Sequence, residues 1–128
     1  MKKVYLVGLL VTLMFMGCKK WEEVTYQYKY EVTGTGGEYS VTLQNSDNNT
    51  QQWSSVGNGW NYTWNQTLAA DKKSGDPFDE NQTRWLYLSA QNLQSQGNVT
   101  VRIYRNNKIV ATNTGFGGFS IATVSGDF

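Results

Sequence analysis

The stretch at residues 24–32 reads Val-Thr-Tyr-Gln-Tyr-Lys-Tyr-Glu-Val, and its pattern decides the fold class. Apolar or aromatic residues occupy every second position, and polar residues fill the positions between them. This period-two alternation, rich in β-branched and aromatic residues, is typical of a β-strand with one buried face. We therefore predict a strand here, with Tyr26, Tyr28 and Tyr30 on one of its faces.

The same signature returns along the rest of the chain, and no segment shows helical periodicity. Further strands are predicted within residues 39–43, 51–56, 60–65, 83–90, 99–104, 108–112 and 119–124. Runs rich in Gly, Asn and Ser separate them, and Asn106-Asn107 fits the two-residue hairpin turn that requires positive φ. This spacing predicts an all-β fold, an immunoglobulin-like (Ig-like) antiparallel β-sandwich of about seven strands.

The composition narrows the classes of function. The chain has 128 residues, no His, one Cys and 16% charged residues, against about 25% charged in an average soluble domain. Without His, a His-dependent catalytic triad and a His-ligated metal site are excluded, and a single Cys excludes an internal disulfide. A formal net charge of +1 gives no electrostatic reason to expect nucleic acid. We expect one domain that is not an enzyme and holds no metal or cofactor.

The first residues have the pattern of a targeting signal. Lys2 and Lys3 precede 13 nearly unbroken apolar residues at positions 4–16. That run is too short for a helix that spans a membrane, which needs about 20 residues, but it fits the core of a signal peptide. The N-terminal segment is therefore excluded from the folded domain.

The apolar run ends at Gly17-Cys18, and a small residue before a lone Cys resembles the lipobox of bacterial lipoproteins, with Phe15 where Leu is usual. A cleaved secretory signal or an uncleaved anchor is the alternative interpretation. The lipobox predicts that Cys18 is acylated and holds the protein at a membrane. The predicted organisation is a lipoprotein signal peptide at 1–17, a lipidated Cys and tether at 18–23, and a β-sandwich domain at 24–128.

The residue after the Cys bears on localisation in the cell envelope. Lys19 stands where many inner-membrane lipoproteins carry a retaining Asp. We therefore favour the outer membrane over the inner membrane, with exposure at the cell surface left open.

Short segments spread over residues 28–126 resemble a known family. They are Tyr30-Glu31-Val32-Thr33-Gly34, Val41-Thr42-Leu43-Gln44-Asn45, Trp60, Leu88-Ser89-Ala90-Gln91-Asn92, Gly97-Asn98-Val99-Thr100-Val101-Arg102-Ile103, Lys108-Ile109-Val110-Ala111 and Ala122-Thr123-Val124-Ser125-Gly126. In this order they resemble the MmpS family of small membrane-anchored β-sandwich proteins. The resemblance implies an accessory role beside exporters of the resistance-nodulation-division (RND) type.

The chain departs from the MmpS pattern in two features. Its anchor has the signature of a lipid where the family has a transmembrane helix. Where mycobacterial members tend to carry a cysteine pair, this chain has Val101 and Val124. This substitution is consistent with a sandwich whose core is stabilised by packing alone.

Two outward-facing pairs form the first candidate binding surface. If Leu86 and Leu88 face the core, Trp85 and Tyr87 face outward, and the same alternation turns Arg102 and Tyr104 outward. If both strands belong to one sheet, the four residues form an aromatic-plus-Arg patch, a composition enriched in interface hot spots. The alternative is that Trp85 and Tyr87 are covered by the segment at 70–82 or are merely half-exposed.

The second candidate is a stripe of aromatic residues on the strand at 60–65. Trp60, Tyr62 and Trp64 share one face of this strand. Such a stripe either packs in the core or forms an exposed platform on which sugar rings stack. Alternation with polar residues favours the core.

A third group of residues, Asp76, Asp79 and Glu80, carries the chemistry of a Ca²⁺ site. Its spacing is irregular, so a solvated acidic loop is the favoured interpretation.

These observations lead to one predicted function and two alternatives. The first is a non-enzymatic, lipid-anchored envelope protein that binds a protein partner, with an RND-type transporter as the expected partner. The alternatives are a glycan- or peptide-binding module at the cell surface and a structural lipoprotein that assembles with itself through edge strands.

The lipobox generates a direct prediction. We expect Cys18→Ala to abolish incorporation of radiolabelled palmitate, because the acyl chains attach through this only thiol in the chain. Labelling of the immunoprecipitated protein is the measurement. Palmitate that persists in the variant contradicts the assignment.

Overall fold

The computed structural model describes residues 23–69 and 83–128, which form eight strands and no helix. The strands are β1 (Glu23–Gly34), β2 (Glu38–Gln44), β3 (Thr50–Gly57), β4 (Trp60–Ala69), β5 (Trp85–Asn92), β6 (Asn98–Arg105), β7 (Lys108–Phe116) and β8 (Ile121–Asp127). Within this part of the chain, no helix is long and apolar enough to span a membrane. The all-β prediction is confirmed, with eight strands where about seven were expected.

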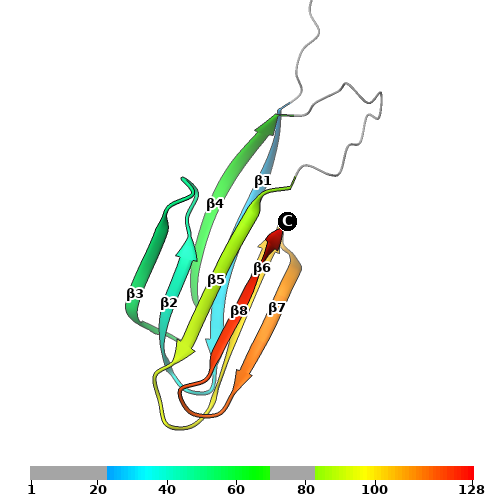
Figure 1. The fold of residues 1–128 in the computed structure, drawn as a ribbon. Coiled ribbons are helices and arrows are strands. Elements are labelled where there is room, and N and C mark those ends of the chain that lie inside the picture. Colours follow the sequence, from blue (N-terminus) through cyan, green and yellow to red (C-terminus); the bar gives the residue numbers. More distant parts are fainter. Residues whose placement is uncertain (1–22, 70–82) are drawn as a thin grey trace, which may run out of the picture.

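The strands form two antiparallel sheets that face each other (Figure 1). Sheet A has the order β4-β1-β6-β7, and sheet B has the order β3-β2-β5-β8. Only two connections join neighbours within a sheet, the turn between β2 and β3 and the turn between β6 and β7. The second is the predicted hairpin turn, where Asn106 and Asn107 have φ of 49° and 64°.

β1 is the centre of sheet A because it pairs with β4 on one side and with β6 on the other. The alternation that predicts this strand also gives its inner face, where Tyr28, Tyr30 and Val32 are fully buried. Lys29 and Glu31, between them, lie on the outer face and are only partly exposed. The period of two in the sequence thus becomes one buried and one solvated surface.

The core lies between the two sheets and is built from the alternating inner residues of both. Its members are Tyr28, Tyr30, Val32, Tyr39, Val41, Leu43, Trp64, Leu86, Leu88, Ala90, Val99, Val101, Ile103, Ala122 and Val124. Val101 and Val124, the positions that the family resemblance singles out, are both core residues and come from different sheets. Apolar packing therefore occupies both positions.

Three buried tyrosines join the sheets through their hydroxyl groups. From β1 in sheet A, Tyr28 donates to the carbonyl of Phe128 at 2.8 Å, and Tyr30 donates to the carbonyl of Gln44 in sheet B at 2.9 Å. In the opposite direction, Tyr39 of β2 donates to the carbonyl of Asn98 at 3.4 Å. Each tyrosine combines a buried ring with a satisfied hydroxyl, as a polar group in a core requires.

Burial raises the pKa of the Tyr28 and Tyr30 hydroxyls above their ordinary value. The cause is desolvation, because a phenolate loses its hydration inside the sandwich. Both groups thus stay protonated in the folded state at pH values where an unfolded tyrosine, with a pKa of about 10, already ionises.

This arrangement predicts how Tyr30→Phe changes stability. At neutral pH we expect the free energy of unfolding to fall by about 1 to 2 kcal/mol, since the Gln44 carbonyl loses its donor. A raised folded-state pKa gives stability that is complete below about pH 10 and is lost as the pH rises above it. The wild type therefore loses stability at alkaline pH, and the variant loses less of it.

Urea denaturation followed by tryptophan fluorescence, at neutral pH and at about pH 11, measures both effects. Tyr62→Phe is the matched control, because Tyr62 stacks on Tyr30 but is only partly buried. Equal alkaline losses in the wild type and in Tyr30→Phe would contradict the assigned role.

Candidate functional site

The aromatic-plus-Arg patch predicted from the sequence is not formed as one surface. Trp85 and Tyr87 lie on β5 in sheet B, whereas Arg102 and Tyr104 lie on β6 in sheet A. All four point outward, as predicted, because their neighbours in the strands are buried. The connection between β5 and β6 crosses from one sheet to the other, so the two pairs occupy opposite faces of the sandwich. The prediction that they share a sheet was wrong.

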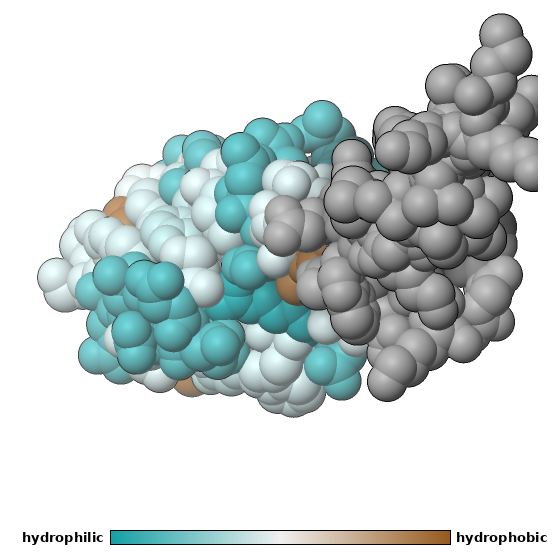
Figure 2. Space-filling view, turned by 90° about the horizontal axis from the view of Figure 1, so that it is seen from above, coloured by the Kyte–Doolittle hydropathy of each residue, from teal (hydrophilic) through white to brown (hydrophobic). Residues whose placement is uncertain are grey.

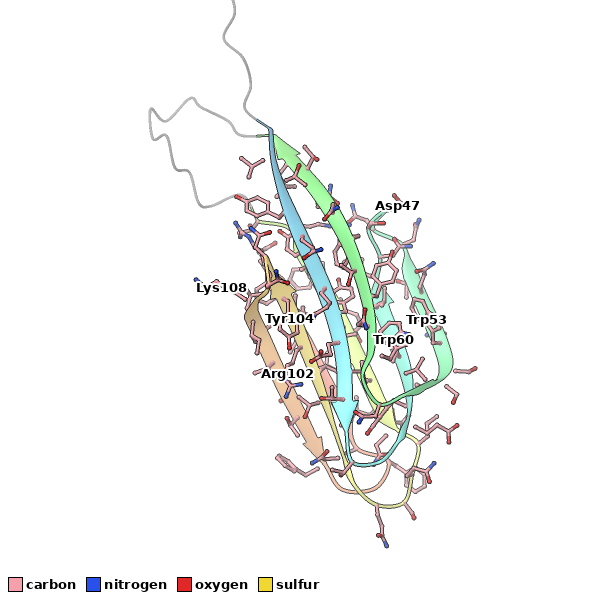
Figure 3. All side chains as sticks on the ribbon, turned by 180° about the vertical axis from the view of Figure 1, so that it is seen from behind. Asp47, Trp53, Trp60, Arg102, Tyr104 and Lys108 are labelled. Carbon is pink, nitrogen blue, oxygen red and sulfur yellow. The ribbon has the colours of Figure 1, made fainter. Side chains whose placement is uncertain are left out.

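Arg102 and Tyr104, which are labelled in Figure 3, belong to a network centred on Glu31. Arg102 donates from Nη1 to Glu31 Oε1 at 3.1 Å and to Thr33 Oγ1 at 2.9 Å. The Tyr104 hydroxyl donates to the same carboxylate oxygen at 3.0 Å. The register explains this arrangement, because Glu31 lies directly opposite Arg102 across the β1–β6 pair.

Lys29 completes this network. Its Nζ lies 4.0 Å from Glu31 Oε2 and 4.1 Å from the centroid of the Tyr104 ring. Burial, followed by the hydrogen bond to Glu31, raises the pKa of Tyr104. Lys29, Glu31 and Arg102 therefore form one interacting group of charges on the outer face of sheet A. Ion pairs this exposed contribute at most about 1 kcal/mol each, so we assign this face a structural role.

The pair on sheet B has different surroundings. Trp85 is 52% exposed and lies opposite Asp127 of β8, and Tyr87 is half-buried opposite Ser125. Most other outward residues of this face carry hydroxyl or amide groups: Ser40, Thr42, Gln44, Thr50, Gln52, Ser89, Gln91 and Thr123. An apolar exception is Ile121, which lies opposite Gln91 and is 60% exposed. In the four strands of sheet B, Glu38 and Asp127 are the only charged residues. This face thus presents an accessible aromatic ring in a polar setting, with one carboxylate residue, Asp127, directly opposite it.

The aromatic stripe of β4 faces inward. Trp64 is a core residue, and its ring centroid lies 4.9 Å from that of Tyr30 and 5.5 Å from that of Tyr62. Trp60 and Tyr62 are partly buried against this core. The stripe forms no outward platform, which agrees with the interpretation favoured by its alternation with polar residues.

Trp53 of β3 is a member of the aromatic cluster that the sequence reasoning missed. Its ring centroid lies 4.9 Å from that of Trp60 and 6.2 Å from that of Tyr62 (Figure 3). The two edge strands β3 and β4 are thus bridged by side chains. The pattern at residues 51–56 is irregular because the β2–β3 register shifts between Tyr39 and Val41, which hides the inner face of β3.

Arg84 was also missed, and it stabilises the end of the sandwich. Its Nη2 donates to the carbonyls of Asn45 at 2.9 Å and Ser46 at 2.7 Å, and its Nη1 donates to Gln66 Oε1 on β4. Arg84 therefore ties the turn after β2 to sheet A. A single Arg beside a predicted strand carries no sequence signal for this role.

The remaining predicted sites lie outside the described residues. These are the lipidation site Cys18 and the acidic residues Asp76, Asp79 and Glu80. Among residues 23–69 and 83–128, no three acidic, Cys or His residues lie close enough together to hold a metal ion.

Comparison with known proteins gives no relative from which a function can be transferred. No protein-family model matches the chain, and no curated protein is significantly similar to it. The resemblance to the MmpS family stays a prediction.

Two tryptophans of contrasting burial give a prediction for the outer face of sheet B. We expect Trp85→Ala to change the free energy of unfolding by about 0.5 kcal/mol or less, because its ring is half exposed and contacts solvent. We expect Trp64→Ala to cost about 3 to 5 kcal/mol, because Trp64 is 9% exposed and lies in the core. Urea denaturation of both variants measures the difference. A loss of several kcal/mol in Trp85→Ala would contradict a free binding surface.

Proposed function

We propose that this protein is a non-enzymatic, lipid-anchored component of the bacterial cell envelope that binds a protein partner. Within this proposal, it acts as an MmpS-like accessory to an RND-type export system. The observation that carries the proposal is the exposed Trp85, beside Tyr87, on the outer face of sheet B.

Trp85 is suited to a binding role because of its surroundings. A tryptophan that is 52% exposed leaves a large apolar surface in water. Tryptophan and tyrosine are among the residues that carry most of the energy in protein interfaces. On sheet A, by contrast, Arg102 and Tyr104 are already engaged with Glu31. We therefore assign partner binding to the sheet B face.

The strand pairing supports the Ig-like part of the proposal. In an immunoglobulin domain, strand B pairs with E in one sheet, and C, F and G pair in the other. The pairs β1–β4 and β2–β5–β8 have the same chain order and the same pairing. The hairpin of β6 and β7 lies beside β1, on the side where strand A of an immunoglobulin domain lies. This hairpin is the main departure from the immunoglobulin order.

Anchoring at Cys18 supplies the cellular context of the proposal. The chain enters β1 at one end of the sandwich, so a tether at 18–23 attaches the domain by that end (Figure 1). We place the protein at the outer membrane, where the sandwich extends away from the lipid. Exposure at the cell surface is compatible with this placement.

The glycan-binding alternative also has an observation in its favour. The face around Trp85 is rich in hydroxyl and amide groups and contains charged residues only at Glu38 and Asp127. Amide and hydroxyl groups both donate and accept hydrogen bonds, as the hydroxyls of a neutral sugar do. An aromatic ring beside them can stack on a sugar ring. A neutral cell-surface glycan is thus the second candidate ligand of the same face.

One experiment separates the two candidates. The full-length, tagged protein is crosslinked in its native membrane, and the captured species are identified by mass spectrometry. We expect an RND transporter or its periplasmic adaptor, and we expect Trp85→Ala to lower its recovery about tenfold. Ile109→Ala is the matched control, because Ile109 is 53% exposed but lies on β7 in sheet A.

The other outcomes contradict the exporter role. If polysaccharide or its synthetic machinery is recovered with the wild type and is lost in Trp85→Ala, the ligand of the sheet B face is a glycan. Crosslinks to further copies of this chain alone support the self-assembling alternative. Equal recovery from Trp85→Ala and the wild type removes the sheet B face from the proposal.

A further inference from the structure

The connection between β7 and β8 exposes three large apolar side chains to solvent. Phe116 is 80% exposed, Phe119 is 58% exposed and Ile121 is 60% exposed. We call these three residues the phenylalanine tip. The tip lies at the end of the sandwich opposite the one where the chain enters β1 (Figure 1). The described surface visible from that other end is coloured teal and white, with only isolated brown residues (Figure 2).

The backbone of Phe119 is in a conformation that this residue rarely adopts. Its φ of 56° lies in the left-handed region, which favours Gly and Asn and disfavours a bulky side chain. Such a conformation is unfavourable, and an exposed ring gains little burial in return. A strained, exposed aromatic residue therefore points to a role outside the stability of this chain.

Hydrogen bonds hold Phe119 firmly in this position. Its N–H donates to the carbonyl of Gln94 at 3.0 Å, and its carbonyl accepts from Gln91 Nε2 at 3.2 Å. The ring is thus presented by a backbone that is fixed on both sides to β5 and the loop that follows it.

Asn92 fixes the loop that carries the tip. This side chain is fully buried, and its Nδ2 donates to the carbonyls of Gln96 at 2.9 Å and Gly117 at 3.3 Å. Gly118, within the tip loop, packs so closely on the loop after β5 that a Cβ there would lie 2.1 Å from the carbonyl oxygen of Ser95. The tip is therefore pre-organised, and binding through it would cost little conformational entropy.

The chemistry of this end of the molecule restricts the occupant. The four loops here, at 35–37, 58–59, 93–97 and 117–120, contain no charged residue. An anionic lipid headgroup thus finds no cation in these loops. One carboxylate lies beside them, that of Glu38 at the start of β2, and it already accepts from Gln94 Nε2 at 3.0 Å and from Ser55 Oγ at 2.8 Å. Three side chains also provide far less than the roughly 800 Å² per partner of a stable dimer interface. A small, rigid apolar projection instead has the form of an anchor that fills a pocket.

We propose that the phenylalanine tip is a plug that inserts into an apolar pocket of a partner protein. The inference rests on the proposed function, since it assumes attachment through the N-terminal end. The 12 residues of β1 hold the tip about 40 Å from that end. The lipid that anchors the chain is therefore not the surface that the tip meets.

Site-specific photo-crosslinking of the full-length protein in its native membrane tests the plug. Phe116 or Phe119 is replaced by p-benzoylphenylalanine, which keeps the phenyl ring, extends it by a benzoyl group and reacts on irradiation with a nearby C–H bond. The control carries the same probe at Ile109, an exposed position at the other end of β7. We expect one discrete protein adduct from positions 116 and 119 and none from 109.

A second variant separates docking from folding. Asparagine accepts the left-handed conformation, so Phe119→Asn removes the ring and relieves the strain. We expect a melting temperature equal to or above that of the wild type, and an adduct yield from position 116 that falls about tenfold. As the control, the probe at position 116 is combined with Ile109→Asn, and we expect this substitution to leave the adduct yield unchanged. A clear fall in melting temperature in Phe119→Asn would show that the ring stabilises the fold instead.

The remaining outcomes overturn the plug. These are adducts with lipid, adducts with a second copy of this chain, the same adduct from position 109, or no adduct. The identity of the captured protein separates this inference from the proposed function. A partner outside the export machinery supports the plug and contradicts the exporter role. If an exporter is captured in a way that depends on Trp85 and no exporter is captured from the tip, the exporter role is supported and the plug is contradicted.

Discussion

The sandwich depends on three tyrosines that cross its core. Tyr28 and Tyr30 reach from β1 to carbonyls on the sheet B side, and Tyr39 reaches from β2 to a carbonyl of sheet A. These bonds run in both directions, so they fix how the two sheets lie relative to each other. The only Cys of the chain is Cys18, so no internal disulfide can take over this role. With the sheets fixed from inside, the outer faces and the end loops are free to serve other purposes.

The two edges of the sandwich are closed in different ways. At one edge, β7 and β8 contact each other directly. At the other edge, Trp53 and Trp60 meet between β3 and β4, and Arg84 ties the nearby turn to β4. The aromatic stripe that resembles a ligand platform in the sequence is thus part of this closure. Among the tryptophans of the described residues, Trp85 is the one that this closure leaves on the surface.

The strands and most of their inner faces were predictable because period two follows directly from strand geometry, whereas the irregular register of β3 hid its inner face. The partners of each strand were not, because alternation says nothing about which sheet a strand joins. β5 and β6 each have the expected inner face, yet their connection crosses between the sheets and separates Trp85 from Arg102. The tip was missed for a related reason. The run of glycines predicts a turn, and Gly117 has a positive φ of 97°, but Phe119 also has a positive φ, of 56°, which no residue preference indicates.

The proposed surfaces share one side of the molecule. β8 runs from Ile121 in the phenylalanine tip to Asp127 opposite Trp85, a distance of about 20 Å for its seven residues. The outward residues between these ends carry hydroxyl groups, and Ser89 on β5 bonds to Thr123 on β8 at 2.8 Å. A partner that fills its pocket with the tip can therefore lie along β5 and β8 and reach Trp85 without meeting a charge before Asp127. The tip and the Trp85 face then act as two anchors of one interface, separated by a polar strip.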